Sequence, residues 1–358
     1  MYCREVLNLL QGTDPIIYED VKDVVKALSS DVQELFKDKS ILVTGIAGFL
    51  GSWLADVLCS LGAKVYGVDN LLTGSINNIK HLMGYSRFKF INTDVLLFKW
   101  NGIKFDFIIH LASIPSPDIY VKFPVETLVI NAEGTYKMLE LARKYDAIFL
   151  YSSTSEVYGD AKVIPTSEDY WGYVNPIGVR SCYDEGKRFA EALCVAYYRE
   201  HGLDVRIARI FNTYGPRLDW KSPGYGRVVI KFIIQALENK PITIYGDGSQ
   251  TRSFCYVSDT VEAITRMLAN NKIKGEVINI GNPLEVTIND LAKLIIELTS
   301  SKSSMSYLPP RPDDPRRRCP DISKITKLLG WKPKVDLRLG LTKTIKWIKY
   351  KMESERSK

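Results

Sequence analysis

Histidine and paired cysteines are scarce in this sequence of 358 residues. Three histidines are too few for a His-rich metal centre. Six cysteines lie scattered without a Cys-x-x-Cys pair, which argues against a zinc site of that kind and against a disulfide framework. We therefore expect reduced thiols, a cytoplasmic location and no metal ion.

Long apolar runs and dense basic clusters are also lacking. No run is long enough to cross a bilayer, and the N-terminus lacks the basic region and long apolar stretch of a signal peptide. The net charge of +7 is mild for this length, whereas nucleic-acid binding needs a concentrated basic face. The only dense run, Arg316–Arg318, stands between prolines and fits a diphosphate-facing loop or a solvated surface better. We expect neither a membrane nor a nucleic acid as partner.

What the sequence does contain is an alternation of apolar strands and helices. This order predicts an α/β fold, a Rossmann-type doubly wound parallel sheet with a smaller α/β C-terminal domain. A hydrophobic content of 46% is enough to fill such cores. The candidate strands of the sheet are 40–44, 64–68, 88–92, 105–110 and 147–151, and the long helices between and after them include 53–61, 126–144 and 183–201.

A glycine-rich turn follows the first strand directly. Gly45, Gly48 and Gly51 have the spacing Gly-x-x-Gly-x-x-Gly between a strand and a helix. Glycines let the backbone approach a pyrophosphate, and the helix N-terminus favours its charge. Asp69 ends the second strand, about 20 residues further on, where an acid binds the ribose hydroxyls of a dinucleotide. Because a carboxylate there repels a 2′-phosphate, the sequence predicts NAD rather than NADP.

A tyrosine and a lysine lie four residues apart in a later helical stretch. Tyr183 and Lys187 open the segment 183–201, which has apolar residues at helical spacing. Positions i and i+4 share one face of a helix, so a phenol and an ammonium would point into one site. The lysine favours the phenolate and makes the tyrosine a usable base near neutral pH. Taken alone, the pair fits a solvated helix face equally well.

In combination, these motifs resemble the extended short-chain dehydrogenases/reductases that act on nucleotide sugars. The resemblance covers residues 39–350, and the glycine turn, Asp69, the Tyr183–Lys187 pair and the segment 211–217 (FNTYGPR) occur in the family's order. Val129 stands where the family has a phosphate-contacting lysine, and residues 1–38 also differ. Within the family the chain is most similar to the UDP-glucuronate decarboxylases, through the segments 110–113, 154–159, 168–188, 226–229, 248–252 and 313–315.

The resemblance implies how the chain divides. Residues 1–38 are a helical extension, with one amphipathic helix or two that split near Ser29 and Ser30. Residues 39–215 form the NAD-binding Rossmann domain, to which 240–265 return. Residues 216–350 mainly bind the nucleotide sugar, and 351–358 form a tail. Within them, glycine, proline and aromatic residues predict a mobile loop at 219–226.

The resemblance also implies the catalytic residues. Tyr183 takes the proton of the sugar's 4-hydroxyl, Lys187 assists it and binds the nicotinamide ribose, and Thr154 donates a hydrogen bond to the same oxygen. Glu156 either organises water or protonates an enolate. Ser155 stands where a 4,6-dehydratase has an acidic aspartate, and a hydroxyl can bond the substrate carboxylate that an aspartate would repel.

Further contacts follow from the matched positions. Arg252 is the expected partner of the substrate's carboxylate or phosphate, since a guanidinium fork suits both. Asp94 could accept a hydrogen bond from the adenine amino group. Cofactor contacts are expected from Gly45, Gly48, Phe49, Leu50, Gly51, Asp69, Asn70, Leu72, Thr73, Asp94, Val95, Leu111, Ala112, Ser113, Ser152, Tyr183, Lys187 and Thr213. Substrate contacts are expected from Ser113, Tyr120, Asn212, Arg227, Tyr245, Arg252, Arg311 and Asp314.

The implied reaction is NAD-dependent decarboxylation of UDP-glucuronate to UDP-xylose through a 4-keto intermediate, with NAD regenerated in the same site. Ser155 followed by Glu156 favours this reaction over its enzymatic alternatives, a nucleotide-sugar 4-epimerase and a 4,6-dehydratase. A catalytically silent NAD-binding redox sensor is the alternative outside enzymes. In the family, helices near 127–144 and 181–201 pair across a twofold axis, so a homodimer is expected.

Overall fold

The computed structural model describes residues 2–11, 14–218, 227–311 and 314–356. The expected mobile loop at 219–226 lies outside these residues, as does Asp313. Within the described part of the chain, no helix has both the length and the apolar character needed to cross a membrane.

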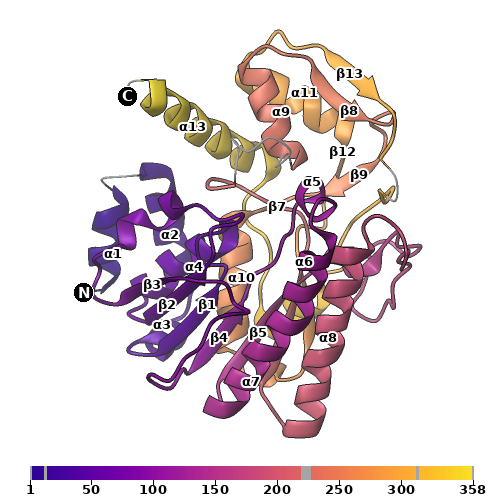
Figure 1. The fold of residues 1–358 in the computed structure, drawn as a ribbon. Helices are drawn as coiled ribbons and strands as arrows, with labels where there is room; N and C mark the ends of the chain where they lie inside the picture. Colours follow the sequence, from indigo (N-terminus) through magenta and orange to yellow (C-terminus); the bar gives the residue numbers. More distant parts are fainter. Residues whose placement is uncertain (1, 12–13, 219–226, 312–313, 357–358) are drawn as a thin grey trace.

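A seven-stranded sheet forms the centre of the fold (Figure 1). Its strands pair in the order β11-β6-β5-β4-β1-β2-β3, and every pairing is parallel. The predicted doubly wound sheet is confirmed. Its strands are β1 (Ser40–Thr44), β2 (Lys64–Asp69), β3 (Phe88–Asn92), β4 (Phe107–His110), β5 (Ile148–Thr154), β6 (Val205–Ile210) and β11 (Val277–Ile280).

Helices cover both faces of this sheet. Neighbouring residues of a strand point to opposite faces, so Ile41 and Val43 of β1 join one hydrophobic core and Leu42 joins the other. The first core includes residues of α4 and α10, and the second includes residues of α7 and α8. These covering helices are α4 (Phe49–Ser60), α7 (Thr135–Tyr145), α8 (Ser181–His201) and α10 (Val257–Ala269).

The helix predicted at 126–144 is longer and changes its pitch in the middle. α6 (Pro124–Val129) continues through a π-helical turn, Ile130–Gly134, into α7. The turn places the buried Asn131 beside the end of β4, where its Oδ1 accepts from Ser113 Oγ at 3.0 Å. A Cβ at Gly186 would lie 3.2 Å from the Cβ of Asn131, so this glycine lets α8 approach the turn closely.

A smaller group of elements lies at one end of the large sheet (Figure 1). In it β8 pairs in parallel with β13, β9 pairs antiparallel with β12, and α9 packs against α11. The bounds are α9 (Val228–Leu237), β8 (Ile242–Tyr245), β9 (Thr251–Ser253), β12 (Glu285–Thr287), α11 (Ile288–Thr299) and β13 (Met305–Leu308). The short connecting elements are η1 (Ile76–Asn78), η2 (Lys80–Leu82), α5 (Pro117–Tyr120), η4 (Ser155–Tyr158), β7 (Thr213–Tyr214), β10 (Cys255–Tyr256), η5 (Asn271–Ile273) and α12 (Ser323–Leu329).

The course of the chain differs from the expected domain boundaries in two places. The segment 240–265 was expected to return to the Rossmann domain. Its helix α10 does pack on α4 and β6, but its strand β8 pairs with β13 in the smaller group. Strand β11 lies beyond that segment, yet it pairs with β6 at the edge of the large sheet. We therefore propose that the Rossmann domain comprises residues 39–218 together with 255–280.

The N-terminal extension forms helices α1 (Tyr2–Gln11), α2 (Pro15–Ala27) and α3 (Ser30–Phe36). Of the two alternatives, one helix or two, the structure has two, with the break between α2 and α3 near Ser29. Figure 1 shows α1 and α2 beside α4, with the C-terminal helix α13 (Leu337–Arg356) above them.

Two buried aspartates of the extension connect it to later parts of the chain. Asp14 accepts a hydrogen bond from Trp347 Nε1 at 2.7 Å and pairs with Lys351 at 3.1 Å, both on α13. Asp20 accepts from Tyr256 Oη at 2.6 Å. The extension is thus bonded both to α13 and to the segment that leads into α10.

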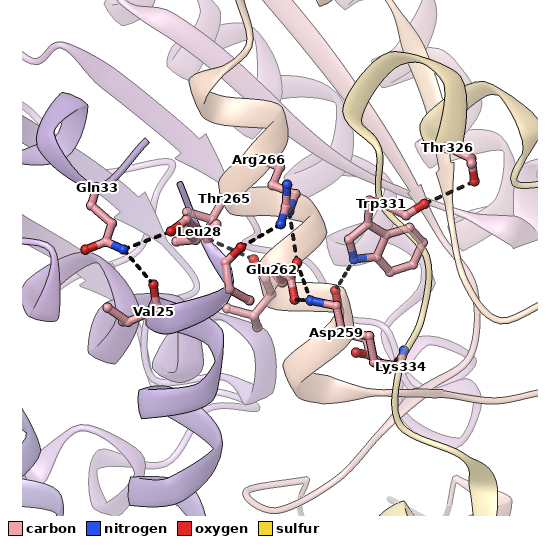
Figure 2. Close-up of polar contacts among 12 residues, drawn as sticks. Val25, Leu28, Gln33, Asp259, Glu262, Thr265, Arg266, Thr326, Trp331 and Lys334 are labelled. Carbon is pink, nitrogen blue, oxygen red and sulfur yellow. Dashed lines mark hydrogen bonds and ion pairs between the residues drawn. The ribbon is translucent and has the colours of Figure 1, made fainter. Parts of the chain in front are cut away.

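Polar contacts also run from the extension across α10 to the segment before α13 (Figure 2). Arg266 of α10 donates from Nη2 to the carbonyl oxygen of Ala27 at 2.8 Å and from Nε to Glu262 at 2.9 Å. Lys334 donates to the same glutamate at 2.7 Å. These bonds join the extension, α10 and residue 334, far apart in sequence, into one structural unit.

Candidate active site

One large cavity of about 1510 Å³ is lined both by residues at the carboxyl ends of the parallel strands and by the smaller group of elements. Open parallel sheets bind ligands at this edge, where the strand order reverses, here between β1 and β4. Every residue predicted above to contact cofactor or substrate lines this cavity. Arg227, Tyr245, Arg252, Arg311 and Asp314 line it from segments that follow residue 226, and the others from residues 45–213.

The glycine turn brings the backbone close to the start of α4. Gly45 has a φ of +71°, and a Cβ there would lie 2.9 Å from the backbone nitrogen of Ala112. A Cβ at Gly51 would lie 2.1 Å from the carbonyl oxygen of Gly45. Phe49 and Leu50, the first residues of α4, line the cavity. Because a helix N-terminus favours negative charge, these residues fit the pyrophosphate of a dinucleotide.

Asp69, at the end of β2, is held by the backbone around it. Its Oδ2 accepts from the amide of Ala47 at 2.9 Å, and its Oδ1 accepts from the amide of Leu71 at 2.8 Å. Burial raises the pKa of this carboxyl, while the two backbone bonds oppose the rise. Nearby, Asn70 Nδ2 donates to Asp94 Oδ2 at 2.8 Å. The carboxylate of Asp69 suits the hydroxyls of a ribose and opposes a 2′-phosphate.

α8 places Tyr183 and Lys187 on one face, at the carboxyl end of β5. The phenol of Tyr183 shares a hydrogen bond with Thr154, the last residue of that strand. Its ring stacks on Tyr120, with 5.2 Å between the ring centres. Lys187 Nζ donates to the carbonyl oxygen of Ser152 at 2.8 Å and lies 5.9 Å from the centre of the Tyr183 ring. The three residues expected to carry the proton chemistry therefore meet in the cavity.

The electrostatics of this pair differ from the expectation. Burial raises the pKa of Tyr183, and the charge of Glu156 adds to the rise; Arg227 and the bond from Thr154 oppose it. Burial also lowers the pKa of Lys187, to about 7. The predicted lowering of the tyrosine's pKa is wrong for this structure, because burial of the phenol outweighs the groups that favour its ionised form.

Ser155 and Glu156 begin the short helix η4 directly after Thr154, and Ser155 is buried. Glu156 accepts ionic hydrogen bonds from two arginines that the sequence analysis did not place in the site. Arg318 lies 2.6 Å from Oε1 and 2.7 Å from Oε2, and Arg180 contacts Oε2. All of these groups line the cavity.

The position of Arg318 corrects the interpretation of the run 316–318. Arg318 is buried, because Glu156 lies within reach of both its terminal nitrogens. Arg317 does have a more exposed side chain, which pairs with Glu285 outside the cavity. A signal for Arg180 was available, since it stands one helical turn before Tyr183. Nothing in the run distinguished Arg318 from its neighbours.

Cations and an aromatic ring line the part of the cavity that belongs to the smaller group. Arg311 lies 4.3 Å and Lys231 4.8 Å from the centre of the Tyr245 ring. Arg252 is buried and pairs with Asp314 at 2.9 Å, so two residues predicted to contact substrate contact each other here. Burial and the charge of Arg318 lower the pKa of Arg252. Across the described residues, no group of His, Cys, Asp and Glu is arranged to hold a metal ion.

Comparisons with known proteins agree with this geometry. A family model described as GDP-mannose 4,6 dehydratase matches residues 42–344. UDP-glucuronic acid decarboxylase 1 of Danio rerio is 50% identical over 317 residues, which cover 88% of this chain and 74% of the relative. UDP-glucuronic acid decarboxylase 6 of Arabidopsis thaliana is 51% identical over 304 residues, which cover 84% of this chain and 86% of the relative.

Solved structures show the same architecture. An epimerase from Methanothermobacter thermautotrophicus aligns with a TM-score of 0.82 and 31% identity, over 91% of this chain and 97% of its own. A UDP-glucuronic acid 4-epimerase from Bacillus cereus, solved with UDP-glucuronic acid and NAD, aligns with a TM-score of 0.78 and 33% identity, over 87% and 99%. The chain belongs to the nucleotide-sugar epimerase and dehydratase family of extended short-chain dehydrogenases/reductases, as a relative of the UDP-glucuronic acid decarboxylases.

Proposed function

We propose that the chain is an NAD-dependent enzyme that decarboxylates UDP-glucuronate to UDP-xylose. Sequence identity to decarboxylases over most of the chain supports the reaction. The observation that carries the proposal is the meeting of Tyr183, Thr154 and Lys187 with the Ser155–Glu156 pair and Arg252 in one cavity. The first three residues suit proton transfer at a sugar hydroxyl, and the others suit a substrate that carries a carboxylate.

Tyr183 would accept the proton of the 4-hydroxyl, and Thr154 would hold the oxygen of that hydroxyl in position by donating a hydrogen bond to it. Bound NAD supplies the redox chemistry, by taking a hydride from the sugar and returning it later. Lys187 would bind the nicotinamide ribose, and protonation on binding would favour the phenolate of Tyr183. The glycine turn, Asp69 and the remaining predicted contacts would hold the two ends of the dinucleotide.

Oxidation at carbon 4 leaves a ketone next to the carbon that bears the carboxylate. Such a β-keto acid loses carbon dioxide because the electrons of the broken carbon–carbon bond move into the ketone as an enolate. Arg252 and Ser155 would hold the carboxylate before it leaves. Protonation of the enolate and reduction of the ketone give the pentose, so the net reaction consumes one proton and no NAD.

The test is turnover of UDP-glucuronate by the full chain with NAD, followed by mass spectrometry. Loss of carbon dioxide supports the proposal, an unchanged mass indicates 4-epimerisation, and loss of water from UDP- or TDP-glucose indicates a dehydratase. Tyr183→Phe should lower kcat by about 10²-fold or more and leave NAD binding in place, since it removes the base alone. Wild-type protein that binds NAD but converts no nucleotide sugar would support the redox-sensor alternative.

We further propose a homodimer through α6, α7 and α8. Leu128, Tyr136, Phe189 and Tyr198 are large side chains on these helices, with between 36% and 53% of their surface exposed. Pairing across a twofold axis would cover them in both copies at once. Phe189→Asp should shift the mass measured by light scattering from two chains to one. Lys272→Asp, an exposed position on η5 and outside these three helices, should leave it unchanged. The cytoplasmic location stays a prediction.

A further inference from the structure

Glu156 lies in an ionic cluster at the end of β5. Both of its carboxylate oxygens face the guanidinium of Arg318, at 2.6 and 2.7 Å, and one of them also faces Arg180. The side chains of Glu156, Arg180 and Arg318 are 15%, 13% and 8% exposed, so water screens these contacts poorly. Arg318 thus holds the carboxylate with both terminal nitrogens, and Arg180 adds a third donor.

Charges from several elements face Glu156. Arg180 is the N-cap of α8, Arg252 lies on β9, and Arg318 follows β13. Three acids face these three guanidinium groups: Glu156, Asp314 and Asp184. Asp314 pairs with Arg252, and burial raises the pKa of Asp184 to about 7. The titratable groups that feel the charge of Glu156 also include Tyr120 and Tyr183.

The balance of this cluster keeps Glu156 ionised. Burial alone would raise its pKa, but the charges of Arg180, Arg318 and Arg252 and the bonds they make lower it to about 2. An acid of that strength is a poor proton donor at neutral pH, because it holds a proton only rarely. Of the two roles open to Glu156, this arrangement disfavours protonation of the enolate.

Arg180 also connects the cluster to the catalytic helix. Its carbonyl oxygen accepts from the amides of Tyr183 and Asp184, at 3.0 and 3.1 Å, in the first turn of α8. Its side chain reaches Asp184 at 3.7 Å. The ion pair with Glu156 therefore fixes the turn that carries the tyrosine.

We propose that Arg180 and Arg318 are positioning residues that hold Glu156 as a permanent carboxylate, and that Glu156 in turn fixes the start of α8 and leaves Arg252 to meet the substrate's carboxylate. The inference rests on the proposed function. It gives a role to two arginines that line the cavity and pair with Glu156. It also predicts that protonation of Glu156, where it can occur, slows turnover to the low rate that a neutral glutamine at this position would give at every pH.

The test is the pH dependence of kcat for carbon dioxide release by Arg318→Gln. With one fork removed and burial unchanged, the pKa of Glu156 should rise above about 4.3, its ordinary value. At least half of this carboxyl is then protonated at pH 4.3, so kcat should be about twofold or more lower at pH 4.3 than at pH 7.5, beyond any decline that the wild type shows over that range. The double variant Glu156→Gln/Arg318→Gln should lack this extra acid limb. Arg317→Gln, the same change in an exposed neighbour, should keep the wild-type profile.

A purely structural role predicts a different result, an equal loss of kcat at every pH. That result, or an extra acid limb that persists when Glu156 is glutamine, would overturn the inference. Arg180→Lys is the second variant, because a lysine retains the charge but has a single nitrogen in place of the two that face Glu156 and Asp184. Its profile should be intermediate, and a profile equal to that of wild type would count against the proposal. Wild-type protein that releases no carbon dioxide would instead refute the proposed function and, with it, this inference.

Discussion

Replacement of Asp14 by alanine should destabilise the whole fold, although this residue lies outside the catalytic residues. Asp14 is the N-cap of α2, where its Oδ1 accepts from the amide of Ile17 at 3.4 Å. Its Oδ2 accepts from Trp347 Nε1 at 2.7 Å and pairs with Lys351 at 3.1 Å. Alanine removes all of these contacts at once and leaves the indole N–H of Trp347 buried without its partner.

The magnitude follows from these contacts. Loss of the N-cap costs about 1 kcal/mol. Loss of a hydrogen bond to a charged group, with a buried donor left unsatisfied, costs about 1.5–3 kcal/mol. The Lys351 pair is part-exposed and adds less than about 1 kcal/mol. We expect a decrease of about 3–4 kcal/mol in the free energy of unfolding, a large share of the 5–15 kcal/mol that is typical of native proteins.

Urea unfolding followed by circular dichroism measures this change. Asp14→Asn should lose less, since asparagine is also a good N-cap. The matched control is Asp31→Ala, an exposed acid in the first turn of α3, which should cost at most about 1 kcal/mol. If Asp14→Ala and Asp31→Ala unfold at the same urea concentration, the extension is not bonded to α13 in the way described, and the reasoning is refuted.

Three further variants test other parts of the cavity. Lys187→Met should raise stability more at pH 6 than at pH 9, as measured by urea unfolding. The folded pKa of Lys187 is lowered to about 7, so its charged form opposes folding below that pH and this cost fades as pH rises toward the unfolded pKa of about 10.4. Arg217→Met should lower the free energy of unfolding by about 3–5 kcal/mol in the same assay. Arg217 Nη1 lies 2.6 Å from the fully buried Asp56, so removal of the arginine leaves a buried carboxylate without this cation. Gly51→Ala should weaken NAD binding about tenfold or more by calorimetry, since its Cβ would lie 2.1 Å from the oxygen of Gly45 and must displace the turn.

The fold was largely predictable because its signals are local. Each strand of the sheet is a short apolar run with a turn residue behind it, and the glycine turn fixes where α4 begins. Long-range pairing was harder to foresee. β8 and β11 have similar length and composition, yet β8 pairs with β13 outside the large sheet and β11 joins its edge. The π turn at 130–134 was also missed, because no residue type in this segment marks where the pitch of the helix changes.

The site shows the same division between local and distant information. Tyr183 and Lys187 could be paired from their spacing, and the glycines and Asp69 from the order of strand, turn and helix. Their protonation could not be predicted, because burial depends on what the rest of the chain places above them. The spacing of the two residues indicates only that phenolate and ammonium attract each other. The fold also removes water from around both groups, which raises the pKa of Tyr183 and lowers the pKa of Lys187.

Arg318 shows most directly why charge must be interpreted together with depth. In the sequence it is the last of three adjacent arginines, and such a run is expected on a solvated surface or beside a diphosphate. Glu156 lies 162 residues earlier, and only the fold brings the two together. A buried arginine without a carboxylate would be costly, and a buried glutamate without a cation would take up a proton. Each therefore explains the other's burial, and the ionised state of Glu156 follows from their contact rather than from either residue alone.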